Sequence, residues 1–265
     1  MLKVRVIPVL YLMNGLIVRS ENFKSFKVIG NPYNELERYS DWMADEVVYV
    51  DITRHGQANM RRSDHKEQGI EDPFELVRAF SKRALMPITY GGRITDLEQA
   101  TKFISAGADK ILINTAAYET PDLITSLSKR HGSNAVMVGV DVRRDENGYS
   151  VFTHQGTRRI SLSFVDYVKR VAELGAGEIL LTSIDNDGCA TGFDTEVVEI
   201  AASSLSIPII ACGGAGSPND FKKPIDAGAS AVAAGNMFHF VENAYKRVKK
   251  RMLLQGVDIR YPFPK

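Results

Sequence analysis

Two similar stretches of the sequence carry different chemistry at matching positions. The apolar run in "VMVGVDVRRDENG" closes on Asp141, and "VRVIPVLYLMNGLIV" holds Tyr11 at the equivalent position. A carboxylate at a strand end can act as a general acid or base, and paired carboxylates can divide the two roles. A phenol has a reference pKa of about 10 and is a poor base at neutral pH. The pair therefore predicts a site with one working carboxylate.

Glycine-rich motifs follow four of the apolar runs and have the composition of anion-binding loops. "CGGAGS" and "AAGNMF" lie late in the chain, and "YGGRI" and "INTAA" repeat them earlier. Glycine lets backbone N–H groups approach an oxyanion closely. Tight turns alone would also use glycine, but two copies favour a ligand with a phosphate at each end. The motifs offer Gly91, Gly92, Arg93, Asn114, Thr115, Gly213, Gly214, Gly235 and Asn236.

These residues need a scaffold that brings strand ends together. Short apolar runs without alternation predict strands buried on both faces of a parallel sheet. They are "VRVIPVL", "EVVYVDI", "MPITY", "KILIN", "AVMVGVD", "EILLTSID", "IPIIAC" and "AVAAG", and segments with helical periodicity lie between them. Eight such units in 265 residues predict one (β/α)8 barrel domain over residues 1–265. A doubly wound open sheet is the alternative, but no G-x-G-x-x-G follows the first run.

An internal repeat refines the barrel prediction. "EVVYVDITRHG" resembles "EILLTSIDNDG", and "MPITYGGRI" resembles "IPIIACGGAGS" in the same order. Two fused half-barrels of four βα units each would explain both pairs. The alternative is that any series of βα units repeats weakly, because buried strands resemble one another.

Composition narrows the classes of function. The formal net charge is +1, whereas a dedicated nucleic-acid-binding protein usually has a strong basic surplus. Cys189 and Cys212 lack metal-ligand spacing, and we expect both to be unpaired buried thiols. The sequence shows neither a signal peptide nor a run of about 18 apolar residues. We therefore expect a soluble cytoplasmic protein that binds no nucleic acid, no membrane and no metal.

Five motifs together resemble the cyclase subunit of imidazole glycerol phosphate synthase, the ammonia-using barrel of histidine biosynthesis. They are "DEVVYVDIT", "GADKILINTAA", "GAGEILLTSIDNDG", "GFDTE" and "PIIACGGAGS", and the resemblance runs nearly end to end. It implies a glutaminase partner that releases ammonia beneath the barrel, an ammonia route through the barrel interior, and a phosphorylated small-molecule substrate. It implies no cofactor.

The resemblance also implies an ammonia gate made of Arg5, Glu46, Lys110 and Glu178. Four charges at the starts of buried strands are costly unless they are paired. Ordinary stabilising ion pairs are the alternative explanation. Asp109, in "GADK", matches a position that faces the glutaminase.

For substrate and phosphate binding, the resemblance adds Arg19, Thr182, Asp187 and Gly188 to the glycine motifs. A helix-capping role would explain Asp187 equally well. Asp51, at the end of a predicted strand, either orients a loop or is purely structural.

Departures from the family pattern cluster at the carboxyl ends of the predicted strands. The family uses two aspartates as acid and base, and here Asp141 retains one while Tyr11 replaces the other. Arg19 stands for a lysine, Arg93 for a glycine and Cys212 for a serine. The gate residues are all present. The sequence therefore predicts that ammonia delivery is kept and that cyclisation is altered or lost.

A branch of the family encoded with surface-polysaccharide genes fits this profile. "RVIPVL", the bulky Tyr11 and the hairpin "VFTHQGTRR" resemble that branch, which implies relay of ammonia to a sugar amidotransferase that adds an acetamidino group. The alternative is the histidine-pathway cyclase, which converts a ribulosyl phosphate intermediate and ammonia to imidazole glycerol phosphate and aminoimidazole carboxamide ribotide. A sugar-phosphate isomerase is a weaker third reading, because it too uses paired aspartates.

Three further segments have open readings. The hairpin from Asp145 to Arg159, with an "NG" turn signal, is expected over the site, where His154 contacts substrate or is merely solvated. His239 is expected to be packed. The basic stretch "RHGQANMRRSDHKEQG" is either a loop that meets an anionic ligand or a solvated charged loop.

Overall fold

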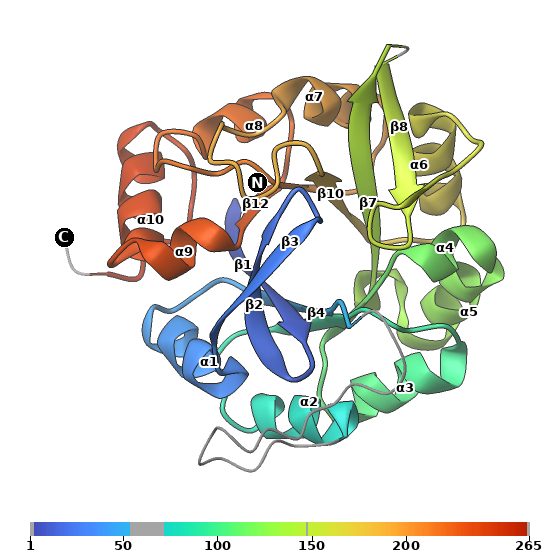
Figure 1. The fold of residues 1–265 in the computed structure, drawn as a ribbon, viewed down its shortest axis with the longest axis horizontal. Helices are drawn as coiled ribbons and strands as arrows, with labels where there is room; N and C mark the ends of the chain where they lie inside the picture. Colours follow the sequence, from blue (N-terminus) through green and yellow to red (C-terminus); the bar gives the residue numbers. More distant parts are fainter. Residues whose placement is uncertain (1–2, 54–71, 147, 264–265) are drawn as a thin grey trace.

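The apolar runs pair side by side as parallel strands and close into a barrel. The computed structural model describes residues 3–53, 72–146 and 148–263 (Figure 1). Pairing of the fifth barrel strand with the sixth, with Asp141 opposite Thr182, completes the ring. The predicted (β/α)8 barrel is therefore confirmed, and an open sheet is excluded. The barrel strands are β1 (Arg5–Met13), β4 (Val47–Asp51), β5 (Ile88–Gly91), β6 (Lys110–Ile113), β7 (Val136–Asp145), β10 (Glu178–Ser183), β11 (Ile209–Cys212) and β12 (Ala231–Ala234).

Helices surround the barrel, as Figure 1 shows. They are α1 (Pro32–Asp41), α2 (Pro73–Ser81), α3 (Leu97–Ala106), α4 (Thr115–Glu119), α5 (Asp122–His131), α6 (Phe164–Glu173), α7 (Thr195–Ser204), α8 (Lys222–Asp226), α9 (Asn236–Phe240) and α10 (Ala244–Leu254). A 3-10 turn spans Ser133–Ala135. Asn31, Asp72, Asp96, Ser163 and Asp194 cap helix starts by accepting backbone N–H bonds. Within the described residues no helix is long and apolar enough to cross a membrane.

Alternation along each strand divides the core into two layers. In β1, Ile7 and Val9 point into the barrel, whereas Val6 and Leu10 point outward to the helices. This is the two-residue period of a strand, and both faces are apolar because both are buried. The inner layer consists of Ile7, Val9, Val48, Leu112, Met137, Leu180, Ile210, Cys212, Ala231 and Ala233. The barrel interior is therefore an apolar column.

Two hairpins extend from the carboxyl ends of the barrel strands, here called the mouth. β1 continues through a two-residue turn into β2 (Leu16–Glu21) and then β3 (Ser25–Gly30). Asn14 and Gly15 both have positive φ in that turn, the conformation that a tight hairpin requires. β7 likewise continues into β8 (Gly148–Thr153) and β9 (Arg158–Arg159). In Figure 1 the β2–β3 hairpin, in blue, crosses the middle of the barrel.

The two halves of the barrel repeat their turn geometry. Gly92 and Gly213 both have positive φ. A Cβ on Gly92 would meet the backbone of Asp51, the last residue of β4, and a Cβ on Gly213 would meet the backbone of Ser183, the last residue of β10. Only glycine fits so close an approach. The second pair of motifs, "INTAA" and "AAGNMF", also corresponds: a five-residue helix begins within each of them, α4 in the first and α9 in the second. This correspondence agrees with the predicted pair of half-barrels.

Candidate functional site

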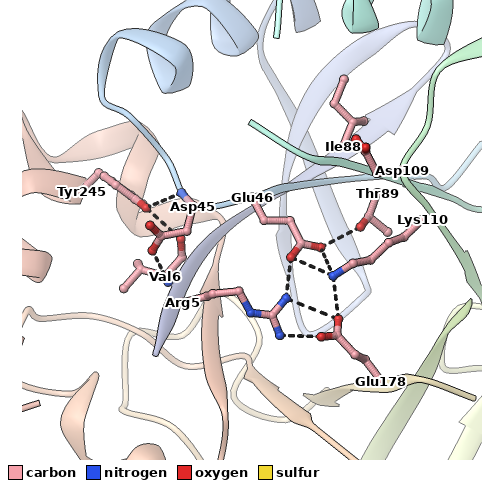
Figure 2. Close-up of polar contacts among 10 residues, drawn as sticks. All are labelled: Arg5, Val6, Asp45, Glu46, Ile88, Thr89, Asp109, Lys110, Glu178 and Tyr245. Atoms are coloured by element: carbon pink, nitrogen blue, oxygen red, sulfur yellow. Dashed lines mark hydrogen bonds and ion pairs between the residues drawn. The ribbon is translucent and has the colours of Figure 1, made fainter. Parts of the chain in front are cut away.

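The amino end of the barrel holds a closed ring of four charges, here called the charge ring (Figure 2). Arg5 donates to Glu46 at 2.6 Å and to Glu178 at 2.6 Å. The Nζ of Lys110 donates to Glu46 at 3.0 Å and to Glu178 at 2.9 Å. Each charge therefore lies between two of opposite sign. The four residues that the sequence singled out as a gate are brought together as one network.

The ring satisfies the electrostatic requirement of its buried position. Glu46 is 2% exposed, and it also accepts a 2.8 Å bond from the Thr89 hydroxyl. Burial on its own would lower the pKa of Arg5, but Glu178 and Glu46 hold that pKa above its usual value. An unpaired charge here would be very costly, so the ring stays closed as long as all four members are present.

Asp109 lies beside the ring. Its carboxylate accepts a 2.8 Å bond from the backbone N–H of Ile88, while the residue itself is exposed. One oxygen therefore fixes the neighbouring strand, and the side chain remains accessible at the amino end of the barrel. Its predicted contact with a glutaminase stays a prediction.

A cavity of about 620 Å³ opens at the mouth. Its floor includes Leu112 and Leu180 from the inner layer of the strands, so it begins where the apolar column ends. The predicted site residues on its wall are Tyr11, Asp51, Gly92, Arg93, Asn114, Thr115, Asp141 and Thr182. The structure thus gathers the acid, the phenol and the first pair of glycine motifs around one space.

Asp141 is the best-placed proton-transfer group in this cavity. The Asn114 side-chain amide donates a 2.7 Å bond to its carboxylate. Burial raises the pKa of Asp141 to about 7, with the Asn114 and Thr182 hydrogen bonds opposing the rise and the nearby Asp187 adding to it. A carboxylate with a pKa near neutral pH can both accept and donate a proton, which suits general acid–base work.

Tyr11 lies among acids but does not pair with them. Its ring packs against the apolar column and meets Phe23 edge-on at 6.2 Å. Burial, reinforced by Asp187, Cys212 and Asp141, raises the pKa of Tyr11 well above its usual value. The hydroxyl therefore stays protonated and cannot serve as a base at neutral pH. It makes no hydrogen bond to any residue within the described ranges.

Asp187 is held by the β2–β3 hairpin. The Ser20 hydroxyl donates a 2.5 Å bond to it, and burial raises its pKa to about 6 despite that bond. At the hairpin tip, the Asn22 amide donates to the carbonyl oxygens of Asp185 at 2.7 Å and Ile184 at 3.3 Å. The hairpin is thereby fastened to the segment that follows β10.

The hairpin separates the two predicted anion motifs. Asn236 donates a 2.8 Å bond to the Ser20 carbonyl, and a Cβ on Gly188 would meet that same carbonyl. Gly213, Gly214 and Gly235 likewise do not border the cavity. Among the described residues, the motifs that border it are therefore those of the first half of the barrel, with Gly92, Arg93, Asn114 and Thr115.

Arg19 is a predicted binding residue that does not border the cavity. Ser20 borders the cavity and Arg19 does not, because neighbouring residues of a strand point to opposite faces. The Arg19 side chain instead pairs with Glu21 at 3.0 Å and lies 5.8 Å from the ring centre of Phe240.

The second hairpin meets the mouth through its far turn. His154 and Gln155, between β8 and β9, border the cavity, and the Gln155 amide donates a 3.0 Å bond across it to Ile52. His154 Nε2 lies 3.4 Å from a Glu119 carboxylate oxygen. The expected position of the hairpin over the site is therefore confirmed for the 154–157 turn, whereas Asp145 and Gly148 pair at its opposite end.

Ser20, Phe23, Thr53 and Thr157 border the cavity without having been singled out from the sequence. The signal that could have found the first two was the Asn14-Gly15 turn, which predicts a hairpin returning over the strand ends. Alternation along β2 then directs Ser20 inward.

The remaining predictions have mixed outcomes. Cys212 is buried on β11 as expected, but Cys189, in the loop after β10, is exposed. His239 is packed, 3.2 Å from Glu35. The basic stretch, with Arg54, Arg61, Arg62 and Lys66, lies outside the described residues. Within the described ranges, no group of three or more His, Cys, Asp or Glu residues is arranged to hold a metal.

Comparison with known proteins agrees with this arrangement. A protein of Corynebacterium diphtheriae named imidazole glycerol phosphate synthase subunit HisF is 38% identical over 264 residues, covering 97% of this chain and 98% of that protein. The proteins of the same name from Natranaerobius thermophilus and Thermobifida fusca are 38% and 36% identical, each covering 98% of this chain. The model of the histidine biosynthesis protein family matches residues 5–243. The chain therefore belongs to the histidine biosynthesis protein family.

Proposed function

We propose that this chain is the ammonia-accepting barrel subunit of a glutamine-dependent synthase, with a glutaminase docked at the amino end of the barrel. The charge ring is the observation that carries the proposal. It stands at one end of an apolar column that leads to the mouth cavity. Neutral ammonia crosses such a column at far lower cost than an ion. Asp109, exposed beside the ring, would face the glutaminase.

The first candidate for the reaction at the mouth is the histidine-pathway cyclisation. The names of the relatives favour it. Ammonia and the ribulosyl phosphate intermediate would meet in the cavity, with one phosphate near Gly92, Arg93, Asn114 and Thr115. Asp141 would move protons as the ring closes, because its pKa of about 7 lets it act in both directions. The products would be imidazole glycerol phosphate and aminoimidazole carboxamide ribotide.

The second candidate is relay of ammonia to a separate sugar amidotransferase, which would add an acetamidino group to a surface-polysaccharide sugar. Tyr11 is the observation that favours it. A neutral phenol packed on the end of the apolar column takes the place of the second carboxylate and leaves Asp141 without an acid–base partner of that kind. Loss of one member of such a pair lowers a rate by about 10²–10⁴-fold.

One experiment separates the two candidates. The purified chain is given ammonium at high pH and the ribulosyl phosphate substrate, and absorbance reports turnover. Tyr11→Asp is measured alongside, with Tyr11→Phe as the control that keeps the ring and removes only the hydroxyl. Circular dichroism confirms that each variant is folded.

Turnover by the native chain would establish the cyclase and exclude the relay. No turnover by a folded native chain would favour the relay. Activity found only in Tyr11→Asp would identify Tyr11 as the residue that prevents cyclisation in the native chain. The shared proposal has its own test, which is binding of a glutaminase subunit and consumption of glutamine. Absence of both would overturn the proposal itself.

A further inference from the structure

A single hydroxyl joins the two backbone segments that carry Arg5 and Glu46. The backbone N–H of Asp45 donates to the Tyr245 hydroxyl oxygen at 2.9 Å, and that hydroxyl donates to the carbonyl of Val6 at 2.9 Å. Asp45 directly precedes Glu46, and Val6 directly follows Arg5. Figure 2 shows Tyr245 beside both segments, on the side away from the charge ring.

The Asp45 carboxylate makes a second connection between the same segments. One oxygen accepts a 2.9 Å bond from the backbone N–H of Val6, and the other accepts a 2.6 Å bond from Lys249. Tyr245 and Lys249 are four residues apart on α10, so they lie on the same face of that helix. Both side chains are fully buried.

The effect is to fix the spacing of β1 and β4 beside the charge ring. Both backbone groups of Val6 are held, and the N–H of Asp45 is held as well. The Arg5–Glu46 contact of 2.6 Å lies one residue away on each strand. The connection beside Lys110 is made by Asp109 and Ile88: the Ile88 N–H donates to the Asp109 carboxylate, and the Asp109 N–H donates to the Ile88 carbonyl, each at 2.8 Å.

We infer that Tyr245, with Asp45 and Lys249, positions the Arg5–Glu46 arm of the charge ring, so that α10 sets how firmly the gate closes. The gate itself belongs to the proposed function, and the inference rests on it to that extent. A buried Lys–Asp pair contributes little stability compared with a well-packed apolar pair. The pair instead helps to fix the position of the chain before β4 relative to β1, so that Arg5 and Glu46 can meet.

The test uses Tyr245→Phe, which removes only the hydroxyl. The matched control is Tyr49→Phe, because the Tyr49 hydroxyl is also buried and donates a 3.2 Å bond to the Pro32 carbonyl, away from the ring. Tyr245→Phe loses two buried hydrogen bonds and Tyr49→Phe loses one, so the control reports what the loss of a buried tyrosine hydroxyl does away from the ring. Only the first touches the network beside Glu46.

The first measurement is the coupling between Arg5 and Glu46. It is obtained from a double-mutant cycle of Arg5→Met and Glu46→Gln in urea denaturation, repeated in each background. The coupling is expected to fall by half or more with Tyr245→Phe and to stay unchanged with Tyr49→Phe. Equal coupling in all three backgrounds would overturn the inference. Where Arg5→Met fails to fold, Arg5→Gln, which also removes the charge, replaces it in the cycle.

The second measurement is the amount of glutamine consumed per ammonia incorporated, in the complex with glutaminase. A poorly positioned gate wastes ammonia, so this ratio is expected to rise about threefold or more with Tyr245→Phe only. Turnover driven by added ammonium should stay unchanged, since that ammonia enters at the mouth. An unchanged ratio contradicts the inference. A chain that neither binds a glutaminase nor supports consumption of glutamine contradicts the proposed function, while the urea cycle still decides the positioning role.

Discussion

The Asn114 side chain donates a 2.7 Å hydrogen bond to the Asp141 carboxylate and so ties the end of β6 to β7 inside the mouth cavity. Asn114 comes from a motif that the sequence assigns to anion binding, and Asp141 is the retained carboxylate. The two lines of chemistry therefore converge on one contact. Burial nevertheless holds the pKa of Asp141 at about 7.

Asp141→Asn is expected to stabilise the protein more at pH 8 than at pH 5. The pKa of Asp141 is about 7 in the folded chain and about 3.9 in the unfolded chain. The native state binds more protons between these values, so stability is lost as the pH rises through about 7. The neutral amide avoids that loss, and the relative gain is about 1–3 kcal/mol. Urea denaturation at the two pH values measures it. The exposed Asp122→Asn should show no such difference.

Glu46→Gln is expected to destabilise the fold more than Glu178→Gln. Glu46 accepts bonds from Arg5, Lys110 and Thr89 and is 2% exposed. Glu178 is 13% exposed, and within the described residues it accepts bonds from the two cations only. Removing one carboxylate leaves two partly buried cations facing a single acid, at a cost of about 3–5 kcal/mol for the more buried position. Chemical denaturation gives both values. An equal or larger loss for Glu178→Gln would contradict the account of the ring.

Tyr11→Phe is expected to change the free energy of unfolding by less than about 0.5 kcal/mol, since the hydroxyl makes no hydrogen bond within the described residues. Tyr11→Ala should cost about 3–5 kcal/mol, because the ring packs on the apolar column and against Phe23. Thermal and urea denaturation measure both. A large loss with Tyr11→Phe would show that the phenol has a structural partner.

Asn22→Gly is expected to loosen the β2–β3 hairpin without unfolding the barrel. Glycine tolerates the φ of 52° at this position, so the substitution removes only the side-chain bonds to the carbonyls of Ile184 and Asp185 and to the Cys189 sulfur. Hydrogen exchange over residues 16–30 should become about 3–10-fold faster, as expected for the loss of about one hydrogen bond. Asn14→Gly, at the other hairpin turn, is the control. Unchanged exchange in Asn22→Gly would show that the tip is not what fastens the hairpin.

Much of the fold followed from local sequence. Apolar runs and helical periods predicted the barrel, because a strand buried on both faces needs an apolar side chain at nearly every position. The glycines of the turns after β5 and β11, Gly92 and Gly213, were predicted for the same kind of reason. A turn that passes against the preceding strand has no room for a Cβ, as at Gly92.

The candidate site was only partly predictable. The members of the charge ring were named from the family resemblance, and barrel closure brings their four strand starts together. Arg19 was named in the same way, but its side chain does not border the cavity. Side chains alternate along β2, and the pairing of β2 with β3 in the hairpin fixes which face Arg19 is on. The contacts of Gly188 and Asn236 with the Ser20 carbonyl also depend on how that hairpin packs.

What the sequence determined by itself was the order and type of the elements, the carboxylate at Asp141 and the phenol at Tyr11. What only the tertiary structure decided was which of these residues share a space. Tyr245 and Lys249 lie about two hundred residues from Asp45, and no local pattern links them. They meet because closure of the barrel packs α10 against the start of β4. Contacts of that kind depend on packing between distant segments, which periodicity and propensity do not encode.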